Sequence, residues 1–280
     1  MNQDVTIRPA ETVADYRACQ EAQRRAWGVA EESYIVPVAT MVGAQQHGGL
    51  VLGAFLPGGE AVGLSFAFLG KTEGRLCLYS QLTGVVPGYQ DQGIGHRLKT
   101  AQRETARSRD IPCVAWAFDP LQAGNARFNL EKLGATAGRY VENMYGPRSD
   151  ALNRDSPTDR LIAVWETTPP PPRPVPTSAD ALPRVIVADP PSFAGLPEGA
   201  PRLLLEIPDD VNRLRAGSPD LAARWGTAVR QAFLAAFAVG YRAVGFVRDP
   251  APEGRRGSYL LERAGSADVQ DPNGSSIHRA

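Results

Sequence analysis

The spacing of apolar and polar residues before residue 169 predicts helices alternating with strands. Thr12 and Asp15 have the spacing of a capping box, and apolar residues follow at helical intervals up to Trp27. Three runs rich in branched and aromatic residues, separated by turn sequences, predict an antiparallel meander. The predicted helices span residues 12–27, 37–48, 93–109 and 125–134, and the predicted strands span 5–10, 49–56, 60–70, 75–86, 112–118, 136–145 and 160–166.

A proline-rich segment at 169–176 separates this part from a second one, because proline cannot donate to a sheet or continue a helix. The second part predicts a strand at 202–209, a helix from Pro219 to Gly240, and strands at 241–247 and 258–263. This order repeats that of residues 113–166, either as a degenerate half-repeat or by chance. We therefore expect domains at 1–168 and 184–264, a linker at 169–183 and a flexible tail at 265–280.

Composition and charge narrow the class of protein. The 280 residues carry 30 Lys and Arg against 30 Asp and Glu, so no long-range field favours nucleic acid. The longest uncharged stretch, 33–59, is broken by prolines and glycines, and the first residues lack the pattern of a secretory signal. Three widely spaced cysteines indicate neither a disulfide scaffold nor a metal site. We expect a cytoplasmic protein that binds neither membrane nor nucleic acid.

The segment from Gly84 to Lys99 runs from a predicted strand through a glycine-containing turn into a predicted helix. The first turn of a helix has amide groups without intrahelical partners and the positive end of the peptide dipoles, so it can hold a phosphate. Gly93 and Gly95 would let an anion approach the backbone closely. The alternative is that the two glycines serve only the tight turn.

Two motifs give this segment a family context. Gln90 to Gly95 fits the pattern Q/R-x-x-G-x-G/A directly after Val85, Val86 and Pro87, and Asn125 precedes the sequence LEKLG at 130–134. Together they resemble the two signatures of the GNAT superfamily of N-acyltransferases, over about residues 5–166. The resemblance implies an α+β fold with a mixed, mostly antiparallel central sheet flanked by helices. It also implies an acyltransferase that uses acetyl-CoA as co-substrate.

Carried over residue by residue, the resemblance implies a cofactor site. Backbone groups near Val85 and Val86 would pair with the pantetheine arm, the turn and the helix start would surround the pyrophosphate, and Asn125 would hold the arm further along. His96 is alternatively an exposed helix residue, and Arg97, Lys99 and Arg103 either meet the nucleotide phosphates or form a solvated face. The implied cofactor residues are Val85, Val86, Gln90, Asp91, Gln92, Gly93, Ile94, Gly95, His96 and Asn125.

The catalytic residues usual in that superfamily are not in their usual places. The predicted strand from Leu76 to Val86 offers no carboxylate, where the superfamily usually has a glutamate, and Leu130 occupies the position of the usual tyrosine. Asp119 could act as base or simply form a turn. Tyr140 and Tyr145 could supply a proton, and Glu142 could anchor an amine, or all three could serve sheet packing or solvent contacts.

The resemblance implies an N-acetyltransferase that transfers an acetyl group directly, in a ternary complex, to an amine of a small molecule or peptide. The alternative is a non-catalytic acyl-CoA-binding or sensing protein, because the usual glutamate and tyrosine are missing. A third interpretation takes the proline-rich segment as a docking site for a partner and predicts no response to CoA.

Overall fold

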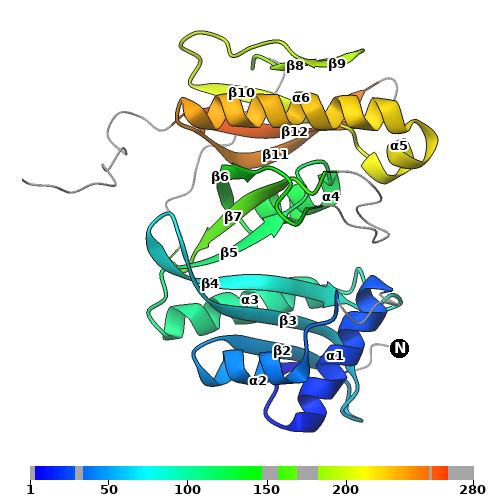
Figure 1. Ribbon diagram of the computed structural model, residues 1–280, viewed down its shortest axis with the longest axis vertical. Coiled ribbons are helices and arrows are strands. Elements are labelled where there is room, and N and C mark those ends of the chain that lie inside the picture. The colour runs from blue at the N-terminus through cyan, green and yellow to red at the C-terminus, as the bar shows by residue number, and fades with distance from the viewer. Residues whose placement is uncertain (1–3, 29–33, 147–156, 169–181, 252–253, 264–280) are drawn as a thin grey trace, which may run out of the picture. The chain divides into compact units, whose positions relative to one another are not determined.

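The computed structural model describes residues 4–28, 34–146, 157–168, 182–251 and 254–263. Figure 1 shows the chain, and internal contacts divide it into two units: Met1–Ala117 with Val164–Pro172, and Phe118–Ala163 with Arg173–Ala280. The division falls inside strands β5 (Cys113–Phe118) and β7 (Arg160–Glu166). The domain boundaries predicted from the sequence stay predictions. The linker residues 169–181 and the tail from 264 onward lie outside the described residues.

The first unit contains the predicted antiparallel meander, which is confirmed. Each strand pairs with the next along the chain, and β4 then pairs in parallel with β5. Every residue of β2 is buried, because both faces of the sheet are covered. The strands of the meander are β2 (Leu50–Phe55), β3 (Ala61–Thr72) and β4 (Arg75–Val85), and β1 (Thr6–Pro9) pairs with β2 as a fourth strand.

Three helices cover the strands of the first unit, α1 (Val13–Trp27), α2 (Val38–Gln46) and α3 (Ile94–Ser108). The predicted capping box is confirmed: the amide of Asp15 donates to Thr12 Oγ1 at 3.2 Å, and the amide of Thr12 donates to Asp15 Oδ2 at 3.1 Å. Helices α1 and α2 pack on one face and α3 on the other (Figure 1). Gly63 of β3 lies under α3, since a Cβ there would come within 3.3 Å of the side chains of Ile94 and Leu98.

Strand β4 carries a bulge that changes which side chains share a face. Two consecutive residues of β3, Phe66 and Ala67, pair with Leu82 and Ser80 of β4, so the pairing passes over Gln81. Side chains alternate between faces in a regular strand, so an extra residue at Gln81 brings Ser80 and Thr83 to the same face. That face is the one that α3 covers, as the contacts of Ser80 with α3 show.

The second unit has antiparallel pairing between β6 (Thr136–Val141), β11 (Tyr241–Ala251), β12 (Gly254–Arg263) and β10 (Arg202–Ile207). Helix α6 (Pro219–Ala238) begins at the predicted proline. The expected α+β class, with mostly antiparallel pairing flanked by helices, is confirmed. The predicted half-repeat stays a prediction.

Three elements of the second unit escaped the sequence patterns: β8 (Ile186–Ala188), β9 (Pro191–Phe193) and α5 (Val211–Gly217). All are too short to show a period. The predicted helix at 125–134 consists of α4 (Ala123–Ala126) followed by the π-helix η2 (Arg127–Lys132).

The strand predicted at 136–145 ends earlier than expected, at Val141. Asn143 has a φ of 43°, in the left-handed region that ends a strand. Its amide donates to Asp159 Oδ1 at 2.9 Å, which holds the chain in a turn.

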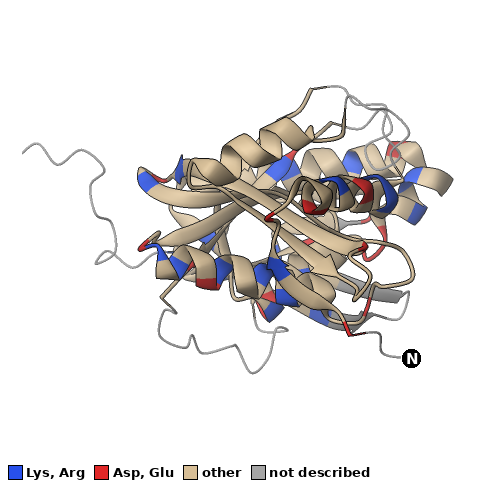
Figure 2. Ribbon diagram, turned by 90° about the horizontal axis from the view of Figure 1, so that it is seen from below, with Lys and Arg blue, Asp and Glu red and all other residues tan. Residues whose placement is uncertain are grey.

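Charged residues lie mainly on the helices, the loops and the strand ends (Figure 2). The apolar residues of the strands form the core, including Leu64 and Phe66 in the first unit and Leu203 to Leu205 in the second. Among the described residues, no helix is both long and apolar enough to cross a membrane.

Candidate functional site

The turn that joins β4 to α3 is built on backbone conformations that favour glycine. Gly88 and Gly93 have φ values of 90° and 76°, and Asp91 has a φ of 60°. Gly93 is the N-cap of α3 and has no side chain to bond the amides of the first turn. The left-handed φ is sufficient reason for a glycine at 93.

Gly95 lacks that reason, because its φ is not in the left-handed region. A Cβ added there would meet only Val85 Cγ2, at 3.8 Å, so the space beside the first turn of α3 is open. A tight turn therefore accounts for Gly93 but not for Gly95. Open space next to orphan amides is what an anion site at a helix start requires.

The end of β4 presents backbone groups at an edge that β5 does not cover. Within the described residues, β5 pairs with β4 only at Cys77, Leu78 and Tyr79, whereas β4 continues to Val85. The amide of Val86 donates to Val62 of β3 at 2.9 Å. Backbone groups alternate in direction along a strand, so those of Thr83 and Val85 point to the opposite, uncovered edge.

The structure separates the two valines that the sequence grouped together. Val86 directs its amide to β3, and its carbonyl accepts from the amide of Tyr89 at 3.0 Å. Val85 has its amide at the uncovered edge, while its carbonyl accepts from Gln90 Nε2 at 3.2 Å. Of the pair, Val85 is the residue placed to bind an added strand-like group.

The remaining predicted residues of the turn have varied surroundings. Gln92 Nε2 donates to the carbonyl of Gly88 at 3.1 Å, Ile94 is buried, and Asp91 is exposed. Gln92 thus closes the turn, whereas Ile94 anchors the helix start to the core.

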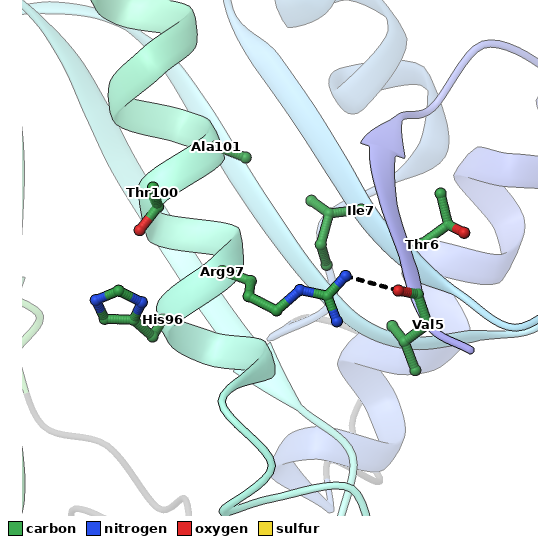
Figure 3. Close-up of a pocket in the computed structure, with 7 residues that line it drawn as sticks. All are labelled: Val5, Thr6, Ile7, His96, Arg97, Thr100 and Ala101. Atoms are coloured by element: carbon green, nitrogen blue, oxygen red, sulfur yellow. Dashed lines mark hydrogen bonds between the residues drawn. The ribbon is translucent and has the colours of Figure 1, made fainter. Parts of the chain in front are cut away.

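His96 is exposed and lines a surface pocket between α3 and β1 (Figure 3). Figure 3 also shows that Arg97 extends toward β1, where its Nη2 donates to the carbonyl of Val5 at 2.7 Å. Arg103 donates to the carbonyl of Glu166 at 2.9 Å and stacks over Trp165. Both arginines thus bond backbone carbonyls of the protein.

Two of the predicted residues lie near the start of α4, in the second unit. Asn125 is exposed on α4. Asp119 accepts from the amide of Leu121 at 2.9 Å and pairs with Arg215 at 3.2 Å. The first of these bonds is the turn-forming role weighed for Asp119 in the sequence.

Tyr140 is buried, and its hydroxyl donates to Asp159 Oδ2 at 2.7 Å. Burial and then the carboxylate of Asp159 raise the pKa of Tyr140 far above its ordinary value. A hydroxyl so held is a poor proton donor.

Glu142 pairs with Arg230 at 3.3 Å, and Arg230 also binds Asp159. Tyr145 is 36% exposed, and Arg160 lies over its ring at 5.3 Å. Asp119, Tyr140, Glu142 and Tyr145 all belong to the second unit, whereas the turn and the edge of β4 belong to the first.

Lys99 corrects a sequence interpretation. It was grouped with charged residues that either meet phosphates or lie on a solvated face, but the residue is only 5% exposed. Its Nζ donates to Ser80 Oγ at 2.9 Å and lies 3.8 Å from the ring centre of Trp116. Burial lowers the pKa of Lys99 from 10.5 to about 7. The apolar pattern of this helix leaves Lys99 among its charged residues, and nothing in the sequence indicates Ser80 or Trp116 as its partner.

No protein-family model matches the sequence, and no curated protein matches it. Solved structures do resemble the chain. The ribosomal-protein-S18-alanine N-acetyltransferase of Escherichia coli is 17% identical, with a TM-score of 0.46, over 61% of this chain and 99% of that one. A putative acetyltransferase of Salmonella typhimurium, solved with acetyl-CoA, is 18% identical, with a TM-score of 0.48, over 61% of this chain and 99% of that one. A GNAT family acetyltransferase of Elizabethkingia anophelis, with acetyl-CoA bound, is 17% identical, with a TM-score of 0.44, over 59% and 99%. Likenesses of this size assign no activity to this chain.

Proposed function

We propose that this protein is an acetyl-CoA-dependent N-acetyltransferase of the GNAT type. The observation that carries the proposal is that two features adjoin: the uncovered edge of β4 at Thr83 and Val85, and the open first turn of α3 at Gly95. An edge of unpaired backbone groups suits an amide-containing arm, and a helix start suits a diphosphate. The Q-x-x-G-x-G motif lies at this junction.

In this proposal the diphosphate of acetyl-CoA binds the amides of Ile94, Gly95 and His96. The pantetheine arm runs along β4 and bonds the backbone of Val85 and Thr83, as an added strand does. The amine acceptor, from a small molecule or a peptide, attacks the thioester carbonyl directly in a ternary complex. Acetyl-CoA supplies the acyl group, and the protein holds it extended.

A second candidate is an acyl-CoA-binding protein without turnover. Two observations favour it: β4 has no carboxylate, and the hydroxyl of Tyr140 is bonded to Asp159. Thiol release from acetyl-CoA, measured across a broad panel of amines, separates the two. Binding without turnover on every amine would favour the second candidate.

Acetyl-CoA is expected to raise the thermal stability of the protein. A ligand at about 100 times its dissociation constant adds roughly 2.7 kcal/mol to the free energy of unfolding. Differential scanning fluorimetry with increasing acetyl-CoA measures the shift. An unchanged melting temperature at millimolar acetyl-CoA would contradict both candidates and favour the interaction-only interpretation.

Gly95→Glu is expected to weaken acetyl-CoA binding by about 100-fold or more, because it places a carboxylate where the diphosphate binds. The fold should survive, since a Cβ at 95 meets only Val85 Cγ2 at 3.8 Å. Isothermal titration calorimetry measures the affinity. Gly43→Glu is the matched control, since Gly43 is an exposed helical glycine of α2 with open space around its Cβ position. Equal affinities for the two variants would rule out this placement of the diphosphate.

A further inference from the structure

A cluster of polar side chains is buried between α3 and the strands β3 and β4. We call it the polar cluster. Lys99 Nζ donates to Ser80 Oγ at 2.9 Å, and Gln102 Nε2 donates to Ser65 Oγ at 3.0 Å. Thr83 joins the two halves, because its hydroxyl lies 3.4 Å from Ser80 Oγ and 2.9 Å from Ser65 Oγ.

The polar cluster is buried but leads toward the edge of β4. Ser65, Ser80, Lys99 and Gln102 are each at most 5% exposed, whereas Thr83 is partly exposed. Gln102 Oε1 is buried and has no hydrogen-bond partner among the described residues, so this oxygen can accept a further hydrogen bond. Such groups cost free energy in a core, and an apolar core would avoid them.

Lys99 lies where β4 and β5 separate. The two strands pair up to Tyr79 and Ala115, and the next residue of each, Ser80 and Trp116, contacts the ammonium group. The bulge at Gln81 is what turns Ser80 and Thr83 to the same face. The amine therefore sits at the closed end of the uncovered edge of β4.

The length of that edge matches the proposed ligand. The partners of Val85 and Ser80 in β3, Gly63 and Ala67, are four residues apart, so this part of the edge is about 13 Å long, which an extended pantetheine arm can span. With the diphosphate at the start of α3, the thioester sulfur would reach Ser80 and Lys99.

Burial in this position lowers the pKa of Lys99 to about 7. The titratable side chains of the adjoining strands, Cys77, Tyr79 and Cys113, project from the opposite face, since they alternate with Ser80 and Trp116. On α3 the next cation is Arg103, whose guanidinium stacks on Trp165 and bonds the carbonyl of Glu166. The carboxylate of Glu166 pairs with Arg75 at 2.7 Å.

We propose that Lys99 is a catalytic residue whose ammonium group protonates the departing thiolate of CoA. This rests on the proposed function. The amine nitrogen of the acceptor forms a bond to the thioester carbon, and the carbon–sulfur bond breaks as the tetrahedral adduct collapses. The thiolate takes a proton from Lys99. The neutral Lys99 then takes back the proton that the acceptor nitrogen loses on becoming an amide, so the enzyme is restored.

The relative pKa values favour Lys99 as the acid that protonates the thiolate, and not as a base that deprotonates the free acceptor ammonium. The ordinary pKa of a thiol is about 8.5, and that of an alkyl ammonium is about 10.4. A lysine that ionises at about 7 gives its proton readily to a thiolate but takes one from an alkyl ammonium only uphill. The acceptor nitrogen becomes acidic only after it has attacked.

The test needs no acceptor, because it titrates the thiol of bound CoA. The protein is saturated with CoA, and the thiolate is followed by its ultraviolet absorbance from pH 5 to 10. The thiol midpoint in the parent protein should lie a few tenths of a pH unit (about 0.3) below that of Lys99→Gln, because Lys99, with a pKa of about 7, is only partly protonated where a thiol ionises. Glutamine keeps a donor for Ser80 Oγ. Lys71→Gln, an exposed lysine on β3, is the matched control and should titrate like the parent.

Each outcome decides between the two proposals. Calorimetry that detects no CoA binding to the parent protein overturns the proposed function and this inference together. Binding with equal midpoints in the parent and Lys99→Gln overturns the inference alone. Mass spectrometry that finds an acetyl group on Lys99 after incubation with acetyl-CoA also overturns it, because Lys99 is then an acyl acceptor.

A measurement on the unsubstituted protein covers the case in which the variant does not fold. Nuclear magnetic resonance of the lysine side chains follows the titration of Lys99 with CoA and with desulfo-CoA, which lacks the sulfur. The pKa of Lys99 should rise with CoA only. Equal shifts with the two ligands contradict the proposal.

Discussion

Lys99→Met is expected to stabilise the protein relative to the parent at pH 6.5, and most of that gain should disappear by pH 10.5. Burial lowers the pKa of folded Lys99 to about 7, whereas the lysine of the unfolded chain keeps its ordinary value of 10.5. One pKa unit corresponds to about 1.36 kcal/mol, so the difference between variant and parent should change by roughly 4 kcal/mol.

The sign follows from which state binds the proton. Between pH 7 and 10.5 the unfolded lysine is protonated and the folded one is neutral, so raising the pH favours folding of the parent. Below pH 7 both states are protonated, and the full cost of burying the charge remains. Methionine has no proton to bind, so the variant lacks this dependence.

Urea unfolding of both proteins at a series of pH values measures the difference, in which the other titrating groups cancel. The exposed Lys71→Met is the control and should show a difference that does not vary with pH. A flat difference for Lys99→Met would mean that Lys99 keeps its ordinary pKa when folded. The chemical role proposed for its amine would then lose its physical basis.

Local sequence signals predicted the parts of the fold that depend on local interactions. The capping box at Thr12 and Asp15 is formed within four residues, so its hydrogen bonds follow from the sequence directly. The turn into α3 needs glycine at Gly93, whose φ is 76°, and that requirement is local too. Both features were therefore readable without knowing the rest of the chain.

The polar cluster could not be predicted in the same way, because it joins residues distant in the sequence. Lys99 meets Ser80 and Trp116, which lie on two different strands. A lysine on an amphipathic helix is usually exposed, and only the separation of β4 from β5 makes room for its ammonium group. The bulge that aligns Ser80 with Thr83 leaves no mark in the hydrophobic pattern.

The same limit applies to the residues considered for catalysis in the second unit. Asp119 is a carboxylate at the end of a predicted strand, and Tyr140 is a side chain that could supply a proton. The structure gives each a partner that the sequence did not indicate, Asp159 for Tyr140 and Arg215 for Asp119. A residue type suggests a role, but the hydrogen-bond and ion-pair partners of that residue come from the tertiary fold.

Asp159→Asn is expected to destabilise the protein by roughly 3–5 kcal/mol, because it removes one partner from a buried ionic network. Asp159 is only 7% exposed. It accepts from Arg230 Nε at 2.8 Å and Nη2 at 2.9 Å, from the hydroxyl of Tyr140 at 2.7 Å, and from the amide of Asn143. An amide in its place has one accepting oxygen and no charge, so Arg230 keeps only the exposed carboxylate of Glu142 as a counter-charge.

Glu142→Gln is the matched control, because Glu142 pairs with the same guanidinium group at 3.3 Å while its side chain is 52% exposed. Exposed ion pairs contribute about 0–1 kcal/mol, so this variant should unfold almost like the parent. Chemical denaturation of the two variants compares a buried and an exposed carboxylate on one arginine. Equal small losses would show that Asp159 is solvated in solution, and Tyr140 would then regain a hydroxyl that can lose its proton.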